Sequence, residues 1–265
     1  MHYRDFLAGV HAALRPPTYL EIGVRNGDSL ALAGCPSIGI DPAYKLKPEI
    51  KAGLREDVRL FRQTSDDYFA RKHPLRPFDG RRVELSFIDG MHLFEFALRD
   101  FANVERLAAW TGVVVFDDIF PREVVEANRE RATRAWTGDV YKILGILGEH
   151  RPDLITLRVD TEPTGLLLVL GLFPGNHVLL DRHDELVAAG VLEDPQPVPA
   201  AVLERRGALD PQAVLDASFW GVLRAARDAG VARRDGFRGL RRAVRRDFGR
   251  QVSPGPLARR LSRAG

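Results

Sequence analysis

Short apolar runs alternate along this chain with longer amphipathic stretches, and this alternation is the feature that most limits its fold. The runs are bounded by turn residues and occupy residues 19–23, 37–41, 58–62, 83–89 and 112–118. Strands of this length separated by helical stretches are typical of successive strand–helix–strand units. The sequence therefore predicts an α/β protein with a mostly parallel sheet flanked by helices.

The connections between these runs refine that prediction. Between the fourth and fifth runs, Phe94, Leu98, Phe101 and Val104 recur at spacings of three and four, which predicts a helix that Gly112 would end. Two further runs, 155–159 and 166–172, are separated by a loop too short for a crossover helix. We expect these two runs to form an antiparallel hairpin at the edge of the sheet.

The pattern changes after the last of these runs. A proline-rich linker at 194–200 separates a predicted domain at 1–193 from a helical extension at 194–265. In that extension Asp210 and Pro211 are typical of a helix start, and the apolar spacing predicts one helix that continues to Gly230.

Charge is distributed unevenly between these two parts. The 265-residue chain has a formal net charge of +3, but residues 231–265 hold eleven Arg and no Lys against two Asp, and so carry +9. The first 230 residues therefore carry −6. An apolar stripe in the basic segment (Phe237, Leu240, Val244, Phe248) predicts a helix that docks on the domain or on a second subunit of a homo-oligomer. Because aromatic residues are sparse and no nucleic-acid-binding module is visible, nucleic acid is the less favoured partner.

Compartment and cysteine content limit the protein class further. The longest apolar run, at 165–173, has about half of the roughly 20 residues that span a bilayer, and the N-terminus lacks a signal pattern. We therefore expect a cytoplasmic protein without a transmembrane segment.

The single cysteine, Cys35, excludes an intrachain disulfide and a Cys-rich zinc site.

A glycine turn follows the first predicted strand, in the stretch from Glu21 through Gly23 and Gly27 to Ser29. Such a turn lets a ligand approach the backbone closely. The spacing differs from the dinucleotide fingerprint, and the acidic Glu21 suits a cationic ligand better than a pyrophosphate. A plain turn with unrelated acidic neighbours is the alternative.

Two more polar residues follow the next two strands. Asp41 ends the second strand, where a carboxylate can accept both hydroxyl groups of a ribose, and Ser65 follows the third, where an adenine edge could bind. Together with the glycine turn they predict a nucleoside-binding site.

Carboxylates also end the fourth and fifth predicted strands. Asp89 ends the fourth, and Asp117 and Asp118 end the fifth. Neighbouring parallel strands bring their carboxyl ends to one crevice, so these three side chains should converge and would repel one another without a cation. Carboxylates of this kind suit Mg²⁺ or Mn²⁺. Alternatively, Asp89 and Asp118 cap the helix and the loop that follow them.

Residues 87–121 (FIDGMHLFEFALRDFANVERLAAWTGVVVFDDIFP) resemble the metal-dependent O-methyltransferases of the macrocin and mycinose sugar-tailoring type, and more distantly the catechol O-methyltransferases. The stretches YLEIGVRNGDSL and SIGIDP resemble the cofactor loops of the same family. The resemblance implies a Rossmann-like fold, S-adenosyl-L-methionine (SAM) as the cofactor, Mg²⁺ on Asp89, Asp117 and Asp118, and His92 as the general base. Outside this context His92 would be an ordinary histidine in the first turn of a helix.

These observations predict a SAM- and Mg²⁺-dependent O-methyltransferase that acts on a hydroxyl group of a small molecule, a sugar or another vicinal diol. The segment from Trp136 to Lys142 is expected to overhang the site or to pack on the sheet. One alternative is a metal-independent methyltransferase in which Asp89 and His92 act directly. Another is a non-catalytic binding protein that uses this fold as a scaffold and the basic tail as its active part.

Overall fold

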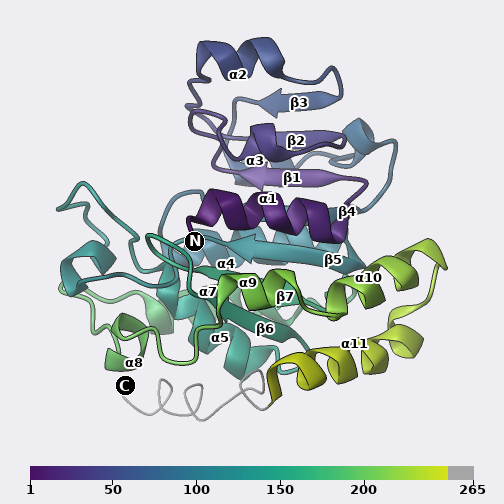
Figure 1. Cartoon of the computed structure of the whole chain (residues 1–265). Helices are drawn as coiled ribbons and strands as arrows, with labels where there is room; N and C mark the ends of the chain where they lie inside the picture. The colour runs from purple at the N-terminus through teal and green to yellow at the C-terminus, as the bar shows by residue number, and fades with distance from the viewer. Residues whose placement is uncertain (250–265) are drawn as a thin grey trace.

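The computed structural model of the chain describes residues 1–249, and within them it forms a seven-stranded sheet with helices on both faces (Figure 1). The strands are β1 (Tyr19–Ile22), β2 (Ser37–Ile40), β3 (Val58–Phe61), β4 (Val83–Ile88), β5 (Ala108–Phe116), β6 (Ile155–Val159) and β7 (Leu166–Leu170). Their order across the sheet is β3-β2-β1-β4-β5-β7-β6. The order reverses beside β1, which creates a crevice at the carboxyl ends of β1 and β4.

The first five strands are parallel, and β7 runs antiparallel between β5 and β6. This arrangement confirms the predicted Rossmann-like class and the hairpin formed by the last two runs. Because β7 is inserted beside β5, the hairpin extends the sheet and the loop between β6 and β7 lies at the carboxyl end of β5.

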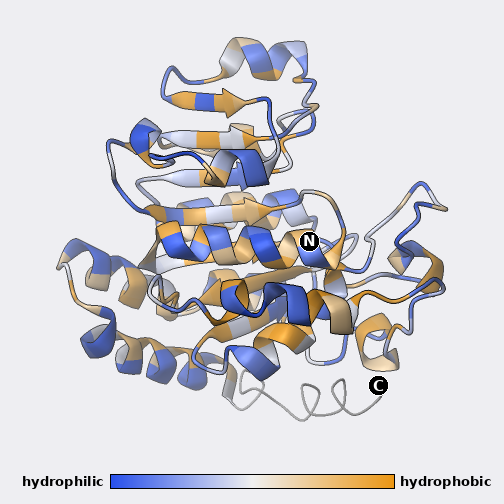
Figure 2. Ribbon diagram, turned by 180° about the vertical axis from the view of Figure 1, so that it is seen from behind, coloured by the Kyte–Doolittle hydropathy of each residue, from blue (hydrophilic) through white to orange (hydrophobic). Residues whose placement is uncertain are grey.

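The helices form two layers. They are α1 (Tyr3–Leu14), α2 (Pro48–Gly53), α3 (Ser65–Phe69), α4 (Phe94–Leu107), α5 (Ile143–His150), α6 (Val178–Asp181), α7 (His183–Gly190), α8 (Ala200–Leu203), α9 (Pro211–Leu215), α10 (Phe219–Asp228) and α11 (Arg233–Phe248). Helices α1, α9, α10 and α11 pack together on one face, and α4 packs with α5, α6 and α7 on the other. Figure 2 shows that the strands in the middle of the sheet are largely apolar, whereas the helices contain both apolar and polar residues. Each face of the sheet therefore has its own hydrophobic core.

The basic helix α11 docks on the sheet of its own chain. Leu240 and Val244 are buried in the core that also contains the α10 residue Leu223, and the ring of Phe237 packs against Gly171. The Trp110 indole nitrogen donates a hydrogen bond to the Val231 carbonyl at 2.6 Å. The predicted apolar stripe is thus used within the chain and leaves the arginine-rich face outward. In the described residues, none of the helices has the length and apolar character needed to cross a bilayer.

Two predicted boundaries are wrong. Helix α4 ends at Leu107, and Gly112 lies inside β5, where the register with β4 shifts and a side chain would press on the carbonyl oxygens of Val83 and Glu84. The glycine thus permits a close approach between strands and does not end a helix.

The helix predicted to run from Pro211 to Gly230 is two helices, α9 and α10. Asp210 caps α9 as expected, accepting a hydrogen bond from the Ala213 amide at 2.8 Å. Between the helices, Ser218 donates backbone and side-chain hydrogen bonds to Asp247 of α11. This bond to a distant residue competes with helix continuation, which explains why local spacing missed the break.

Candidate active site

The glycine turn after β1 lies directly against the end of β4. Gly23 has φ +91°, and a Cβ atom at this position would overlap the carbonyl oxygen of Asp89. Gly27, at φ +87°, completes the turn. Only glycine fits such a close approach with positive φ, so the turn and Asp89 are held together as one unit.

Glu21 stabilises this turn from inside the sheet. Its side chain is fully buried, and its two oxygens accept hydrogen bonds from the Tyr19 hydroxyl at 2.6 Å and from Ser29 Oγ at 2.8 Å. Burial raises the pKa of Glu21 to about 8, although both hydrogen bonds oppose the shift. Glu21 and Ser29, both predicted as cofactor residues, therefore meet one another beneath the glycine turn.

Asp41 lies beyond the end of β2 and closes the neighbouring loop. One carboxylate oxygen accepts a hydrogen bond from the Arg25 amide at 2.7 Å and the other from the Ala43 amide at 2.6 Å. The side chain is partly exposed at the edge where a ribose would lie. Ser65 is the first residue of α3, and its side chain opposes the rise that burial causes in the pKa of Asp100 of α4, the helix that follows Asp89.

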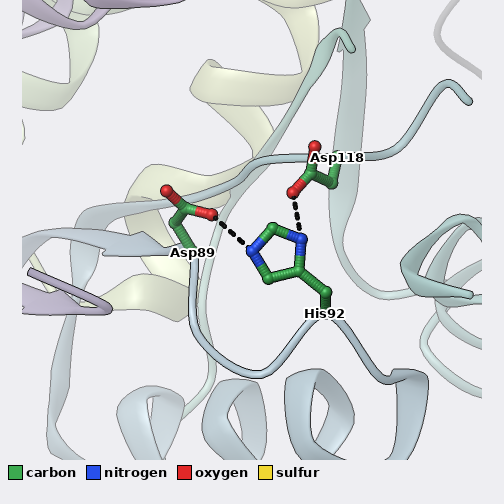
Figure 3. A group of neighbouring side chains, drawn as sticks. All are labelled: Asp89, His92 and Asp118. Carbon is green, nitrogen blue, oxygen red and sulfur yellow. Dashed lines mark ion pairs between the residues drawn. The ribbon is translucent and has the colours of Figure 1, made fainter. Parts of the chain in front are cut away.

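Asp89, His92 and Asp118 form a compact cluster at the carboxyl ends of β4 and β5 (Figure 3). His92 Nδ1 lies 2.7 Å from Asp118 Oδ2, and His92 Nε2 lies 3.4 Å from Asp89 Oδ1. One ligand atom from each residue lies within 4.8 Å of the others, a spacing that could hold a metal ion. The structure therefore brings together three of the four residues predicted for the chemistry.

The surroundings of His92 fix which of its nitrogen atoms carries a proton. Nδ1 faces two acceptors, the Asp118 carboxylate and the Trp136 carbonyl oxygen at 3.0 Å, so it must be the donor. Nε2 is then the atom that gains or loses the exchangeable proton. Burial lowers the pKa of His92, but the hydrogen bond and charge of Asp118 and the charges of Asp89 and Asp117 outweigh it and raise the pKa to about 9.

Asp117, the fourth predicted residue, lines the same small cavity as the other three, but its carboxylate forms no ion pair with a residue of 1–249. Its Oδ1 accepts hydrogen bonds from the Asp118 amide at 2.8 Å and from Thr164 Oγ1 at 3.3 Å, which ties β5 to the loop between β6 and β7. Burial first, and then the charges of Asp118 and Asp89, raise its pKa well above the usual range. Burial and the charge of Asp118 likewise raise the pKa of Asp89. The site thus concentrates negative charge that its own side chains compensate only in part.

Backbone strain accompanies this cluster. His92 and Asp118 adopt left-handed conformations, with φ of +56° and +62°, which residues other than glycine rarely do. Such outliers persist where the surrounding structure holds them and are concentrated at functional sites.

The segment predicted to overhang the site does so through Trp136. Its indole ring stacks on the His92 imidazole with the planes 9° apart and the centroids at 5.1 Å. Gly138, at φ +54°, allows this segment to approach, because a Cβ atom there would overlap the His92 carbonyl oxygen. Residues 136–138 therefore fix the position of His92 from above.

The spacing of residues gave no signal for Asp139, whose carboxylate is completely buried. It accepts hydrogen bonds from the Phe94 amide at the start of α4 and from Arg129 and Lys142, each at 2.8 Å. Because Phe94 follows His92 by two residues, Asp139 anchors the turn that carries the histidine. Its role depends on contacts between distant segments, which no local pattern encodes.

Residues 20–119 match the family model described as a methyltransferase domain. The matched stretch runs from β1 to the residue after Asp118 and includes the glycine turn, Asp41 and the whole Asp89–His92–Asp118 cluster. The match covers less than half of the chain, and it agrees with the predicted methyltransferase class for the stretch in which the site is built. The narrower resemblance to the macrocin and mycinose type stays a prediction.

Several solved structures match the chain in part. Cofactor-bound Rv0187 from MTB is 21% identical, with a TM-score of 0.46 over 64% of this chain and 79% of that one. The O-methyltransferase TomG from Streptomyces achromogenes, solved with SAM and involved in tomaymycin synthesis, is 17% identical, with a TM-score of 0.47 over 64% and 80%. An O-methyltransferase from Bacillus cereus, in complex with S-adenosylhomocysteine (SAH), is 13% identical, with a TM-score of 0.43 over 63% and 80%. No curated protein matches the chain.

Proposed function

We propose that the protein is a SAM-dependent O-methyltransferase that methylates a hydroxyl group of a small molecule, a sugar or another vicinal diol. The observation that carries the proposal is the position of the Asp89–His92–Asp118 cluster. It lies against the glycine turn, within the stretch that matches a methyltransferase domain. An acid–base cluster beside this turn supports the proposal, because a hydroxyl group bound to it would be close to a cofactor held by the turn.

We propose Gly23, Gly27 and Asp41 as the residues that contact the cofactor, with Glu21 and Ser29 holding the turn and Ser65 at the adenine end. The carboxylate of Asp41 keeps lone pairs for a ribose, since each oxygen accepts only one backbone hydrogen bond. Asp89, whose backbone lies against Gly23 of the turn, would face the cofactor's ammonium group.

The donor set fits a hard divalent cation. Asp89 and Asp118 offer oxygen ligands beside the buried Asp117. Burial first, and then the neighbouring carboxylates, raise the pKa values of Asp89 and Asp117, and a bound cation would favour their ionised forms. Bound there, Mg²⁺ or Mn²⁺ would polarise the acceptor hydroxyl group and lower its pKa. Because such ions prefer oxygen, His92 is left for proton transfer.

The carboxylates around His92 keep a proton on Nε2 through a pKa of about 9, and a cation that compensated their charge would release it. Nε2 would then accept the proton of the acceptor hydroxyl group. Its Nδ1–H stays bound to Asp118 and the Trp136 carbonyl, which holds the ring in place while Nε2 changes its protonation. In the transfer, the acceptor oxygen forms a bond to the methyl carbon as the carbon–sulfur bond breaks, and SAH leaves. The side chains thus supply orientation and a base, which are the two protein contributions that this reaction needs.

A metal-independent methyltransferase is the second candidate, and the His92 geometry favours it. Both imidazole nitrogens already face carboxylates, so a protonated His92 can hold the cluster together without a cation. In that case Asp89 and His92 would act directly, and Asp117 and Asp118 would be structural.

Three measurements on one protein preparation test these proposals. Calorimetry should detect SAH binding, and a protein that does not bind SAH is not a SAM-dependent methyltransferase. Electron paramagnetic resonance should show Mn²⁺ binding that Asp118→Asn weakens at least tenfold and the control Asp184→Asn, at a fully exposed site, leaves unchanged. A screen of hydroxylated small molecules with methyl-labelled SAM, with and without EDTA, then separates the two candidates, since the metal-independent enzyme would keep its activity.

A further inference from the structure

Tyr3, at the start of α1, lies at the edge of the site although it is far from the site residues in sequence. The N-terminal residues pair with the loop between β6 and β7: the Tyr3 amide donates to the Glu162 carbonyl at 2.9 Å, and the Glu162 amide donates to the Met1 carbonyl at 2.9 Å. Figure 1 shows this end of the chain beside the edge toward which the parallel strands point. The same loop carries Thr164, which hydrogen-bonds Asp117.

The Tyr3 ring is fixed over β4. It stacks on Phe87, two residues before Asp89, with centroids 6.3 Å apart and planes 18° apart. The next residue, Arg4, forms an ion pair with Asp28 of the glycine turn at 2.7 Å, and Lys47 binds the same carboxylate at 2.8 Å. The first turn of α1 is thus attached both to the strand that carries Asp89 and to the loop that would hold the cofactor.

The Tyr3 hydroxyl group is available for a ligand. Tyr19 and Tyr68 donate their hydroxyl groups to Glu21 and to the Pro74 carbonyl, each at 2.6 Å, whereas that of Tyr3 makes no hydrogen bond to any residue of 1–249. Burial, and then the charges of Asp117 and Asp89, raise the pKa of Tyr3, so its phenol stays protonated and can donate.

The charges around this hydroxyl group match a zwitterion. The carboxylates of Asp117, Asp89 and Glu21 act on the pKa of this hydroxyl group, and the Arg4 guanidinium lies 6.0 Å from the centre of the Tyr3 ring. An amino-acid group bound here would place its ammonium against the carboxylates and its carboxylate against a hydroxyl donor with a positive charge nearby. The methionine part of SAM is such a group.

We propose that Tyr3 is a cofactor-binding residue whose hydroxyl group donates a hydrogen bond to the carboxylate of the methionine part of SAM. This inference rests on the proposed function, because it requires a SAM site at the glycine turn. It adds a residue from the N-terminal helix to a site otherwise built from strand ends, and it makes α1 part of the cofactor pocket.

Tyr3→Phe tests the inference, since it removes one oxygen and keeps the stacking ring. The probes are SAH, which has the amino-acid group, and 5′-methylthioadenosine, which lacks it. A hydrogen bond to a charged group predicts that calorimetry will show about a tenfold rise in the SAH dissociation constant of Tyr3→Phe. The dissociation constant for 5′-methylthioadenosine should stay within twofold of that of the wild-type protein.

Each other outcome has a definite meaning. An unchanged SAH affinity overturns the inference, and so does an equal loss for both ligands, which would show that Tyr3 only shapes the pocket. Thermal unfolding of the variant checks that its fold is intact. If the wild-type protein binds neither SAH nor 5′-methylthioadenosine, the proposed function itself is refuted, and this inference with it.

Discussion

Gly138→Ala provides the sharpest test of how His92 is held. In real proteins a Cβ atom essentially never lies within 3.0 Å of a heavy atom that is not its neighbour in the chain. A Cβ atom at position 138 would lie only 1.6 Å from the His92 carbonyl oxygen. The overlap involves backbone on both sides, so no side-chain rotation can relieve it. The turn that carries His92 must therefore move, by more than about 1 Å, and a displacement of that size can lower a rate by roughly 100-fold.

The left-handed conformation adds a separate cost, which a matched variant measures. Gly230 has φ +62°, close to the +54° of Gly138, but a Cβ atom there meets nothing within 4 Å. Alanine in this conformation costs about 1–2 kcal/mol at either position. Gly230→Ala therefore reports the backbone strain alone, and the difference between the variants reports the overlap with His92.

Two assays follow the displacement. Turnover with labelled SAM, using the acceptor found in the screen, should fall roughly 100-fold in Gly138→Ala, a loss that corresponds to about 2.7 kcal/mol of activation free energy. In Gly230→Ala it should fall less than threefold. Binding of SAH should be preserved, because the glycine turn contacts Asp89 and not His92. If Gly138→Ala turned over as fast as Gly230→Ala, the idea that residues 136–138 position the histidine would be wrong.

Three further predictions concern stability. Burial lowers the pKa of His11 to about 4, so the wild-type protein should lose about 3 kcal/mol of folding free energy more than His11→Phe as the pH falls from 6.5 to 4, measured by urea unfolding. Asp139→Ala should lower the free energy of unfolding by about 3 kcal/mol, because it removes the buried carboxylate that pairs with Lys142 and leaves Arg129 with Glu95 alone, and thermal unfolding would show it. Leu240→Ala should lower the free energy of unfolding by roughly 2–5 kcal/mol in the same assay, because this side chain of α11 is fully buried.

His11 is uncharged in the folded protein, so its contribution is fully present above the unfolded-state pKa of about 6.5 and is lost toward acid. An identical acid dependence in His11→Phe would contradict the buried, neutral state. Arg241→Ala, on the exposed face of α11, should change stability by less than about 0.5 kcal/mol. If Leu240→Ala also changed stability by less than about 0.5 kcal/mol, α11 would not be docked on the sheet in solution.

The strand ends were predictable because topology alone assigns their place. Once Asp89 and Asp118 follow neighbouring parallel strands, their convergence depends on no detail of packing. The hairpin was equally accessible, since the loop after residue 159 is too short for any crossover. Both features follow from the spacing of apolar runs and from the length of the loops between them, which can be read from a single sequence.

The remaining features depend on contacts between distant segments. In the sequence, a glycine that ends a helix and a glycine that allows two strands to approach closely look the same. Only the position of β4 against Gly112 shows which role it has. The break before α10 depends on Asp247, and the placement of His92 depends on Gly138 and Asp139. None of these partners lies close in sequence to the residue it controls, so local spacing could not reveal them.

The antiparallel insertion of β7 has a consequence for the order of folding. β6 and β7 pair from Ile155–Leu170 to Val159–Leu166 across a short loop, whereas the β7 residues that pair with β5 lie more than 50 residues after it in the chain. Because closing a longer loop costs more entropy, we expect the hairpin to form early and to dock on β5 later. Pulsed hydrogen exchange should then protect the amides that bond β6 to β7 before those that bond β7 to β5. The bond between Thr164 and Asp117 forms only at this docking step, so the chain completes its active site at the end of folding.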